Sequence, residues 1–317
     1  MTFSFRDTGR TSLIFLLRVH LFNVVTVMTF DANVLSDKFS DEKDFLNRLE
    51  GGIKQVLKGV EEGANSLDDS VKLMNSYLYS YPHMVKYFDR LYDKDEKESE
   101  RESENYKMRE HELVGALFMV YGWMPIILRF DFKEKDRPEE LSELLLFLSK
   151  LRGKDAARIW EEVDKDQNNV TSGKETEIKG YLQILKEMLG GSVVGLSKFL
   201  HFVNPYVFPM YDSNVSKALR KRVADVESYI RYAKSFDRIC EKFHVNEICD
   251  PKKRACLNEF QRGVAAEVDR FNEKFRCETT PVRAVEFVLF LEGREIKRNE
   301  AEARRRGKEE ERQANMR

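Results

Sequence analysis

Two side chains with complementary chemistry lie near the two ends of one apolar segment. Lys198 is near the start and Asp212 near the end of "GLSKFLHFVNPYVFPMYDSNV", residues 195–215, which otherwise carries one histidine and two prolines. A lysine that is partly desolvated beside a carboxylate can act as an amine nucleophile and form a Schiff base. Lys198 and Asp212 are therefore the candidate catalytic pair.

Two helices and a proline-rich connector must position this pair. We expect a helix over about 196–204, stopped by Pro205, with Lys198 at its start. The connector that follows is expected to be extended, and Asp212 has the side chain of an N-cap for the next helix. The first helix carries the chain roughly 9 Å away from Lys198. An extended connector can span roughly 23 Å, so a return to Lys198 is geometrically possible.

The order of glycine hairpin, lysine, apolar helix and "P-x-x-FP-x-x-D" resembles the core of the helix-hairpin-helix DNA glycosylases, particularly the 8-oxoguanine glycosylase branch. The resemblance is confined to about residues 190–222. It implies a glycosylase-like, two-lobed helical domain in which Lys198 attacks the sugar C1′ and Asp212 assists. A target base would be extruded into a cleft between the lobes. The side chains that could read or stack on that base are His201, Phe202, Trp160 and Trp123.

The same resemblance implies contacts with DNA phosphates. Gly191, Val194 and Gly195 would lie in a phosphate-binding hairpin, whose backbone N–H groups and helix N-terminus suit an anion. DNA is thus the expected partner, and no cofactor is expected. Further phosphate contacts would come from the basic residues that follow Asp212, which are Lys217, Arg220, Lys221 and Arg222.

A second interpretation of the same residues remains open. Lys198 would then be a solvated lysine, His201 would satisfy a hydrogen bond in the core, and Asp212 would only cap a helix. The chain would be a non-enzymatic helical interaction protein. Its formal net charge of -1 and pI of about 6.6 are not typical of a nucleic-acid binder, so contacts with DNA would have to come from local basic patches.

Two other clusters carry partial patterns of metal sites. The loop 164–175 spaces oxygen side chains as a calcium loop does, but Asn169 stands where the tight turn needs glycine. The second cluster, Cys240, His244, Cys249 and Cys256, lacks the C-x2-C spacing of zinc knuckles. We therefore expect a solvated loop, reduced cysteines and no metal site.

The chain as a whole predicts an all-α fold, irregular rather than a simple bundle. Apolar residues recur at helical spacing over long segments, and alternation typical of strands is scarce. Two glycines, Gly51 and Gly52, are expected to weaken or divide one helix, and Pro82 to break another. We divide the chain into N-terminal helices at 31–92, a charged connector at 93–110, a main helical core at 111–295 and a charged tail at 296–317.

Both ends of the chain carry a separate expectation. The apolar segment 12–28 is interrupted by Arg18 and His20, which makes it a poor membrane span. Met28 repeats the opening "MTF", so residues 1–27 are a doubtful extension and Met28 a possible true start. The tail is expected to be a frayed helix or disordered, with arginines that are either solvated or in contact with phosphates. A soluble intracellular protein without membrane contact is the expectation.

Overall fold

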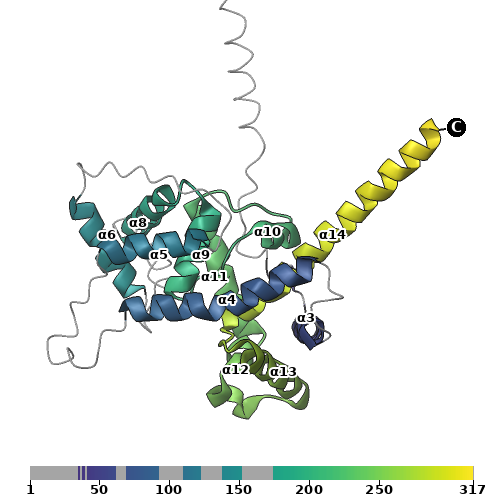
Figure 1. Cartoon of the computed structure of the whole chain (residues 1–317). Coiled ribbons are helices and arrows are strands. Elements are labelled where there is room, and N and C mark those ends of the chain that lie inside the picture. The colour runs from purple at the N-terminus through teal and green to yellow at the C-terminus, as the bar shows by residue number, and fades with distance from the viewer. Residues whose placement is uncertain are drawn as a thin grey trace, which may run out of the picture.

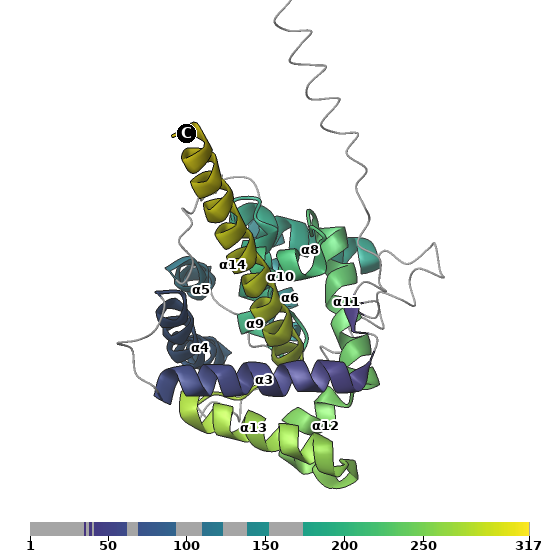
Figure 2. The same cartoon turned by 90° about the vertical axis from the view of Figure 1, so that its right-hand side faces the viewer.

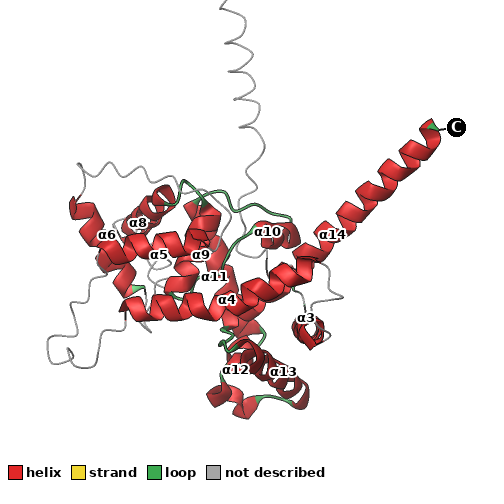
Figure 3. Cartoon of the chain, in the orientation of Figure 1, coloured by secondary structure: helices red, strands yellow, loops and turns green. Residues whose placement is uncertain are grey.

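All regular elements in the described part of the chain are helices. The computed structural model describes residues 35, 38–39, 41–61, 69–92, 110–122, 138–151 and 174–316. These residues contain no strand (Figure 3), so the predicted all-α class is confirmed. The helices are α3 (Glu42–Glu61), α4 (Asp69–Tyr92), α5 (Glu110–Gly122), α6 (Pro138–Lys150), α8 (Lys174–Met188), α9 (Val193–Val203), α10 (Ser213–Leu219), α11 (Val226–Lys242), α12 (Val245–Cys249), the 3-10 helix η3 (Pro251–Cys256), α13 (Glu259–Phe275) and α14 (Pro281–Asn315).

Helices α9 and α14 are the two around which the others pack. α9 is apolar on nearly every side and contacts α4, α5, α8 and α11. α14 contacts α3, α10, α11 and α12, while α13 packs against α3 (Figure 2). Figure 1 shows the C-terminal part of α14 projecting beyond the other helices. The buried part of α14 therefore joins the C-terminal helices to the elements that carry the candidate pair.

Two predicted helix breaks do not occur. α3 runs without interruption through Gly51 and Gly52, and α4 runs through Pro82. Gly52 is buried against α14, where an added Cβ would crowd the Leu291 side chain. The glycine is thus explained by close helix packing, which outweighs its low helix propensity. A proline removes one backbone hydrogen bond, and the packing of α4 against α9 and α13 compensates for that loss.

The turn before α9 differs from the predicted hairpin. Gly190 and Gly191 have positive φ angles of 66° and 74°, which glycine adopts without strain, and they form the turn between α8 and α9. α9 then begins at Val193, earlier than the sequence predicted, because the Ser192 side chain accepts a hydrogen bond from the Gly195 N–H at 3.0 Å. Lys198 consequently lies in the second turn of α9 rather than at its start.

The region after Asp212 forms two helices, α10 and α11. α10 ends at Leu219 because Arg220 adopts the left-handed conformation, with φ 53°. α11 has its own N-cap, in which Asp225 and Ser228 form a reciprocal capping box. The C-cap at Arg220 and the N-cap at Asp225 therefore separate the two helices.

α10 and α14 approach each other very closely. The contact is made at Gly293, where an added Cβ would overlap the backbone carbonyl of Asn214. Around it, Lys297 donates to the Ser213 hydroxyl at 2.7 Å, and the Lys217 amine pairs with Glu300 at 2.6 Å. Because Asp212 is the N-cap of α10, this contact also fixes the position of the candidate carboxylate.

Several predicted features lie outside the described residues. They include residues 1–27 with Met28, nearly all of the charged connector 93–110, Trp123, Trp160 and most of the loop 164–175. The tail from 296 is not frayed along its length, since α14 continues to Asn315. None of the helices in the described ranges combines the length and apolar character needed to cross a membrane.

The contact at Gly293 leads to a first prediction. Replacing Gly293 with alanine forces α10 away from α14 and is expected to lower the free energy of unfolding by about 1–3 kcal/mol or more. Thermal and urea denaturation measure the change. Gly307→Ala is the matched control, because nothing lies within 4 Å of an added Cβ there and alanine favours the helix. Equal stability of the two variants would show that the close contact is not important.

Candidate functional site

A side-chain hydrogen bond brings the candidate lysine and aspartate together. The Ser197 hydroxyl accepts a hydrogen bond from the Tyr211 N–H at 2.9 Å, and it also lies 3.2 Å from the Tyr211 carbonyl oxygen. These two residues directly precede Lys198 and Asp212 in the chain. The proline-containing connector thus returns to α9 at the turn that carries Lys198.

Asp212 is a true N-cap, as predicted. Its Oδ1 atom accepts hydrogen bonds from the backbone N–H groups of Asn214 at 2.8 Å and Val215 at 2.9 Å. The carboxylate is only partly buried, and its negative charge lies at the N-terminus of α10, where the backbone N–H groups favour an anion. Local capping therefore fixes the aspartate rotamer independently of any ligand.

Lys198 lies in a partly buried environment with mixed charge. Burial lowers the pKa of its amine, because the ammonium form loses hydration. The carboxylates of Asp212 and Glu286 act in the opposite direction and raise the pKa, while the Arg283 guanidinium lowers it further. The neutral amine that nucleophilic attack requires is thus more accessible at Lys198 than at a solvated lysine.

Glu286 and Arg283 of α14 form the buried charged centre beside this pair. The Glu286 carboxyl is paired with the Arg283 guanidinium and accepts a hydrogen bond from the Met210 N–H at 3.3 Å. Burial raises the pKa of Glu286 to about 7, although Arg283 opposes the shift. Neither residue carried a recognisable signal in the sequence, because Glu286 lies 76 positions from Met210 and Arg283 lies over the ring of Tyr81, which belongs to the distant helix α4.

His201 belongs to the core and not to a ligand-binding surface. Its side chain has no exposed surface, Nδ1 lies 2.8 Å from the Phe208 carbonyl and Nε2 lies 2.8 Å from the Tyr81 hydroxyl. Since a carbonyl only accepts, Nδ1 donates and Nε2 accepts the hydroxyl proton of Tyr81. Phe202 is buried as well. In this structure His201 therefore cannot contact DNA, which corrects the expectation from the sequence.

The predicted phosphate-binding hairpin is only partly a turn. Gly191 is exposed in the turn, whereas Val194 and Gly195 lie in the first turn of α9 and Gly195 is buried. The backbone N–H of Gly195 is already bonded to Ser192. The N–H of Gly191 is also engaged, since it donates to the Lys186 carbonyl at 2.8 Å.

The four predicted basic residues gather around the C-terminal end of α10. Arg220 and Arg222 are exposed, and Lys217 and Lys221 are half-buried. The carbonyl of Lys221 accepts hydrogen bonds from the Ser216 hydroxyl at 3.0 Å and the Tyr211 hydroxyl at 3.2 Å, so this segment is held against the connector. These basic residues therefore lie at the C-terminal end of α10, whereas Asp212 caps its N-terminus.

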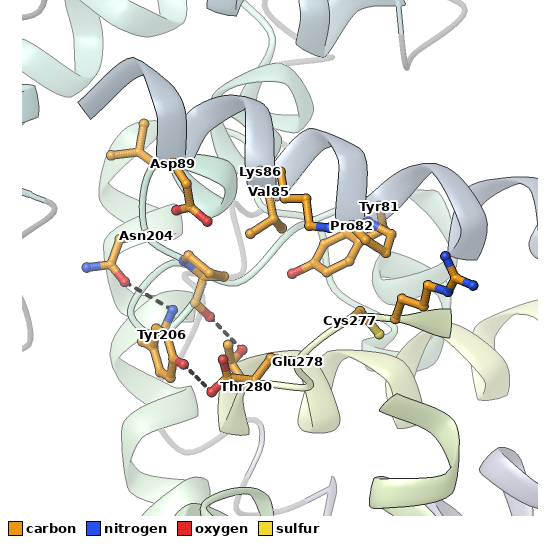
Figure 4. Close-up of a pocket in the computed structure, with 13 residues that line it drawn as sticks. Tyr81, Pro82, Val85, Lys86, Asp89, Asn204, Tyr206, Cys277, Glu278 and Thr280 are labelled. Atoms are coloured by element: carbon orange, nitrogen blue, oxygen red, sulfur yellow. Dashed lines mark hydrogen bonds between the residues drawn. The ribbon is translucent and has the colours of Figure 1, made fainter. Parts of the chain in front are cut away.

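One cavity of about 380 Å³ lies between α4 and the segments that flank the connector and α14. Figure 4 shows the Tyr206 hydroxyl, which donates to Glu278 at 2.5 Å, and the Thr280 hydroxyl, which donates to the Pro205 carbonyl at 2.7 Å. Tyr81 forms part of the wall and connects the cavity to His201. Lys198 and Asp212 do not line this cavity, so it is distinct from their immediate surroundings.

The cysteines and the candidate metal ligands do not assemble. Cys240 and Cys249 are buried free thiols, Cys256 is an exposed one, and His244 is also exposed. Burial raises the pKa of Cys249 to about 12, which favours the protonated thiol. Across the ranges that the structure describes, no group of three or more ligands could hold a metal ion.

Comparison with known proteins identifies no relative of this chain. No protein-family model, no curated protein and no solved structure matches the chain. The function of the cluster around Lys198 must therefore be inferred from the contacts of its own residues.

The buried imidazole gives a second prediction. The pKa of His201 is lowered to about 3, first by burial and then by Arg283, so acid favours the unfolded chain, in which the imidazole can be protonated. Stability from this group is complete above about pH 6.5 and is lost as the pH falls toward 3. The contribution of Glu286 to stability has the opposite sign. Because its pKa is raised in the folded protein, this group adds stability as the pH falls from about 7 to 4.5.

Comparison with a variant isolates the contribution of His201. Between pH 6.5 and pH 4 the wild type is expected to lose about 2–3 kcal/mol more than His201→Gln in urea denaturation. Glu286 is present in both proteins, so most of its contribution cancels. His244→Gln, which changes an imidazole that is 53% exposed, should behave like the wild type. Identical acid sensitivity of wild type and His201→Gln would contradict the assignment.

Proposed function

We propose that this protein acts on DNA as a base-excision glycosylase or abasic-site lyase, with Lys198 as the amine nucleophile and Asp212 as the assisting carboxylate. The close placement of the two residues, through the hydrogen bond between Ser197 and Tyr211, is the observation that carries this function. The lowered pKa of Lys198 supports it, because attack requires a neutral amine.

The reaction follows from ordinary amine chemistry. At an abasic site the Lys198 nitrogen adds to the C1′ aldehyde, the carbinolamine loses water, and an iminium ion remains. In excision of a base, the nitrogen bonds to C1′ while the glycosidic bond breaks and its electron pair leaves with the base. The base takes up one proton from the solvent, and the nitrogen, now attached to C1′, loses one. Asp212 then provides a negative charge near the positive charge that develops at C1′ and nitrogen.

A non-enzymatic helical interaction protein is the competing function. The observation in its favour is that His201, Glu286 and Ser197 all bind backbone groups of the connector, so much of the polar cluster has a structural role. On this alternative, Lys198 and Asp212 complete a buried corner and a helix cap. The two functions differ in whether the Lys198 amine forms a covalent bond with DNA.

Borohydride trapping provides the third prediction. Wild-type protein incubated with duplex DNA that contains an abasic site or an oxidised purine is expected to give a covalent adduct on denaturing gels. Lys198→Ala and Lys198→Met should give none, because each removes the amine and the second keeps most of the apolar stem. Lys179→Gln, on the surface of α8, is the control lysine and should leave the adduct unchanged.

Asp212→Asn tests the carboxylate without removing the cap. Asparagine is as good an N-cap as aspartate, so α10 should keep its capping hydrogen bonds while the negative charge is lost. The adduct should form at least tenfold more slowly, with little change in melting temperature. Absence of any adduct from folded wild-type protein with every lesion would exclude the lyase and favour the interaction protein.

A further inference from the structure

The exposed half of α14 separates its charges by face. All residues from 301 to 316 are exposed, and Figure 1 shows this segment extending away from the other helices. At 3.6 residues per turn, seven basic residues from position 294 onward fall within about 120° of the helix circumference. We call them the basic stripe, and they are Arg294, Lys297, Arg298, Arg304, Arg305, Lys308 and Arg312. Four of them lie in the exposed half, and the three that precede it include Arg294 and Lys297, which are half-buried.

The acidic residues of the same segment lie on the remaining circumference. They share that side with one arginine, Arg306. No acidic residue falls within the 120° that the seven basic residues occupy, so this part of the surface carries one sign of charge. Two of the acidic residues border the stripe and pair with it, Glu295 with Arg298 at 3.9 Å and Glu300 with Arg304 at 3.4 Å. The acidic residues outside the stripe are Glu295, Glu300, Glu302, Glu309, Glu310 and Glu311.

The basic stripe begins beside the candidate site. Lys297 donates to the hydroxyl of Ser213, the first residue of α10. Burial lowers the pKa of Lys297, although the nearby Asp212 carboxylate opposes the shift. The pairs Lys297–Ser213 and Lys217–Glu300 show that α10 runs in the same direction as α14. The end of α10 and the basic segment 220–222 thus lie next to the start of the exposed half.

The composition of the stripe indicates the chemistry of its partner. It contains no large apolar side chain, so it lacks the seam that a coiled coil of two copies requires. A helix that lies in a membrane surface also needs an apolar face, which is missing here. The stripe extends about 27 Å along the helix axis, and duplex DNA presents one negative charge per about 1.7 Å. A row of phosphates matches this surface in both charge and length.

We propose that the basic stripe of α14 binds the phosphate backbone of duplex DNA and directs the duplex toward Lys198 and Asp212. The second part of this statement rests on the proposed function, while the binding itself does not. The stripe supplies affinity without sequence preference, because phosphate contacts carry no base information. Arg220 and Arg222 extend the same surface at the end of α10.

Adjacent arginines allow a matched test, which is the fourth prediction. Arg305 lies on the stripe and Arg306 on the acidic face, so Arg305→Gln and Arg306→Gln remove the same charge at neighbouring exposed positions. Fluorescence anisotropy with a labelled, undamaged 20-base-pair duplex measures the affinity over a range of salt concentrations. Arg305→Gln should weaken binding severalfold at low salt, and Arg306→Gln by less than about twofold.

A triple variant measures how many phosphate contacts the stripe makes. Arg305→Gln, Lys308→Gln and Arg312→Gln together should reduce the slope of log affinity against log salt by about 3, because each lost phosphate contact removes about 0.9. Circular dichroism must show that the helix is retained. Equal weakening by Arg305→Gln and Arg306→Gln, an unchanged slope in the triple variant, or equal competition by polyglutamate would each overturn the inference.

The outcomes also separate this inference from the proposed function. If DNA binding depends on the stripe but no borohydride adduct forms, only the enzymatic function fails. If the adduct forms in wild type and the triple variant binds DNA as tightly as wild type, only the inference that the stripe binds DNA is wrong. Concentration-dependent self-association that is lost in the triple variant would instead assign the surface to a second copy of the chain.

Discussion

A buried stretch of non-helical backbone is the constraint on which the centre of this protein depends. Residues 207–211 are buried, and Pro205 and Pro209 prevent the connector from continuing α9 as a helix. Each buried N–H or C=O group without a partner would destabilise the fold by about 1–3 kcal/mol. Other elements satisfy these groups with side chains. Those that reach residues 205–211 are Ser197, His201, Tyr229, Tyr232, Thr280 and Glu286.

This constraint explains why the core contains so many polar side chains. The hydroxyls of Tyr229 and Tyr232 donate to the successive carbonyls of Pro209 and Met210, and burial raises the pKa of both well above the usual range, so both remain donors. Glu286 accepts from the same segment, and its pairing with Arg283 offsets the cost of burying a carboxylate. The network that fixes the connector also holds Lys198 and Asp212 in place.

Local signals in the sequence predicted much of this arrangement. The cap at Asp212 and the end of α9 before Pro205 depend on neighbouring residues, and each could be read from the chain. Packing between distant elements could not. Gly52 looked like a break in a helix because its reason is α14, more than two hundred positions away.

The polar centre was hidden for the same reason. Glu286 and Arg283 are surrounded by apolar residues in a segment that reads as an ordinary amphipathic helix. The partner of Glu286 comes from the connector, and Arg283 lies over Tyr81 of α4. The sequence left two interpretations of His201 open, because a histidine in an apolar run has the same pattern whether it serves a ligand or a backbone carbonyl. Hydrogen-bond partners that are far apart in sequence decide between the two, and one sequence does not reveal them.

α14 connects the core to the surface in a single rigid element. Its first turns supply Arg283 and Glu286, its middle holds α10 through Gly293, and its exposed end carries the basic stripe. A continuous helix of 35 residues is about 52 Å long, and its rigidity fixes the distance from the stripe to Asp212. A phosphate backbone bound along the stripe would therefore approach the N-terminus of α10 in one defined direction. Flexible attachment of the same charges would give affinity but no such alignment.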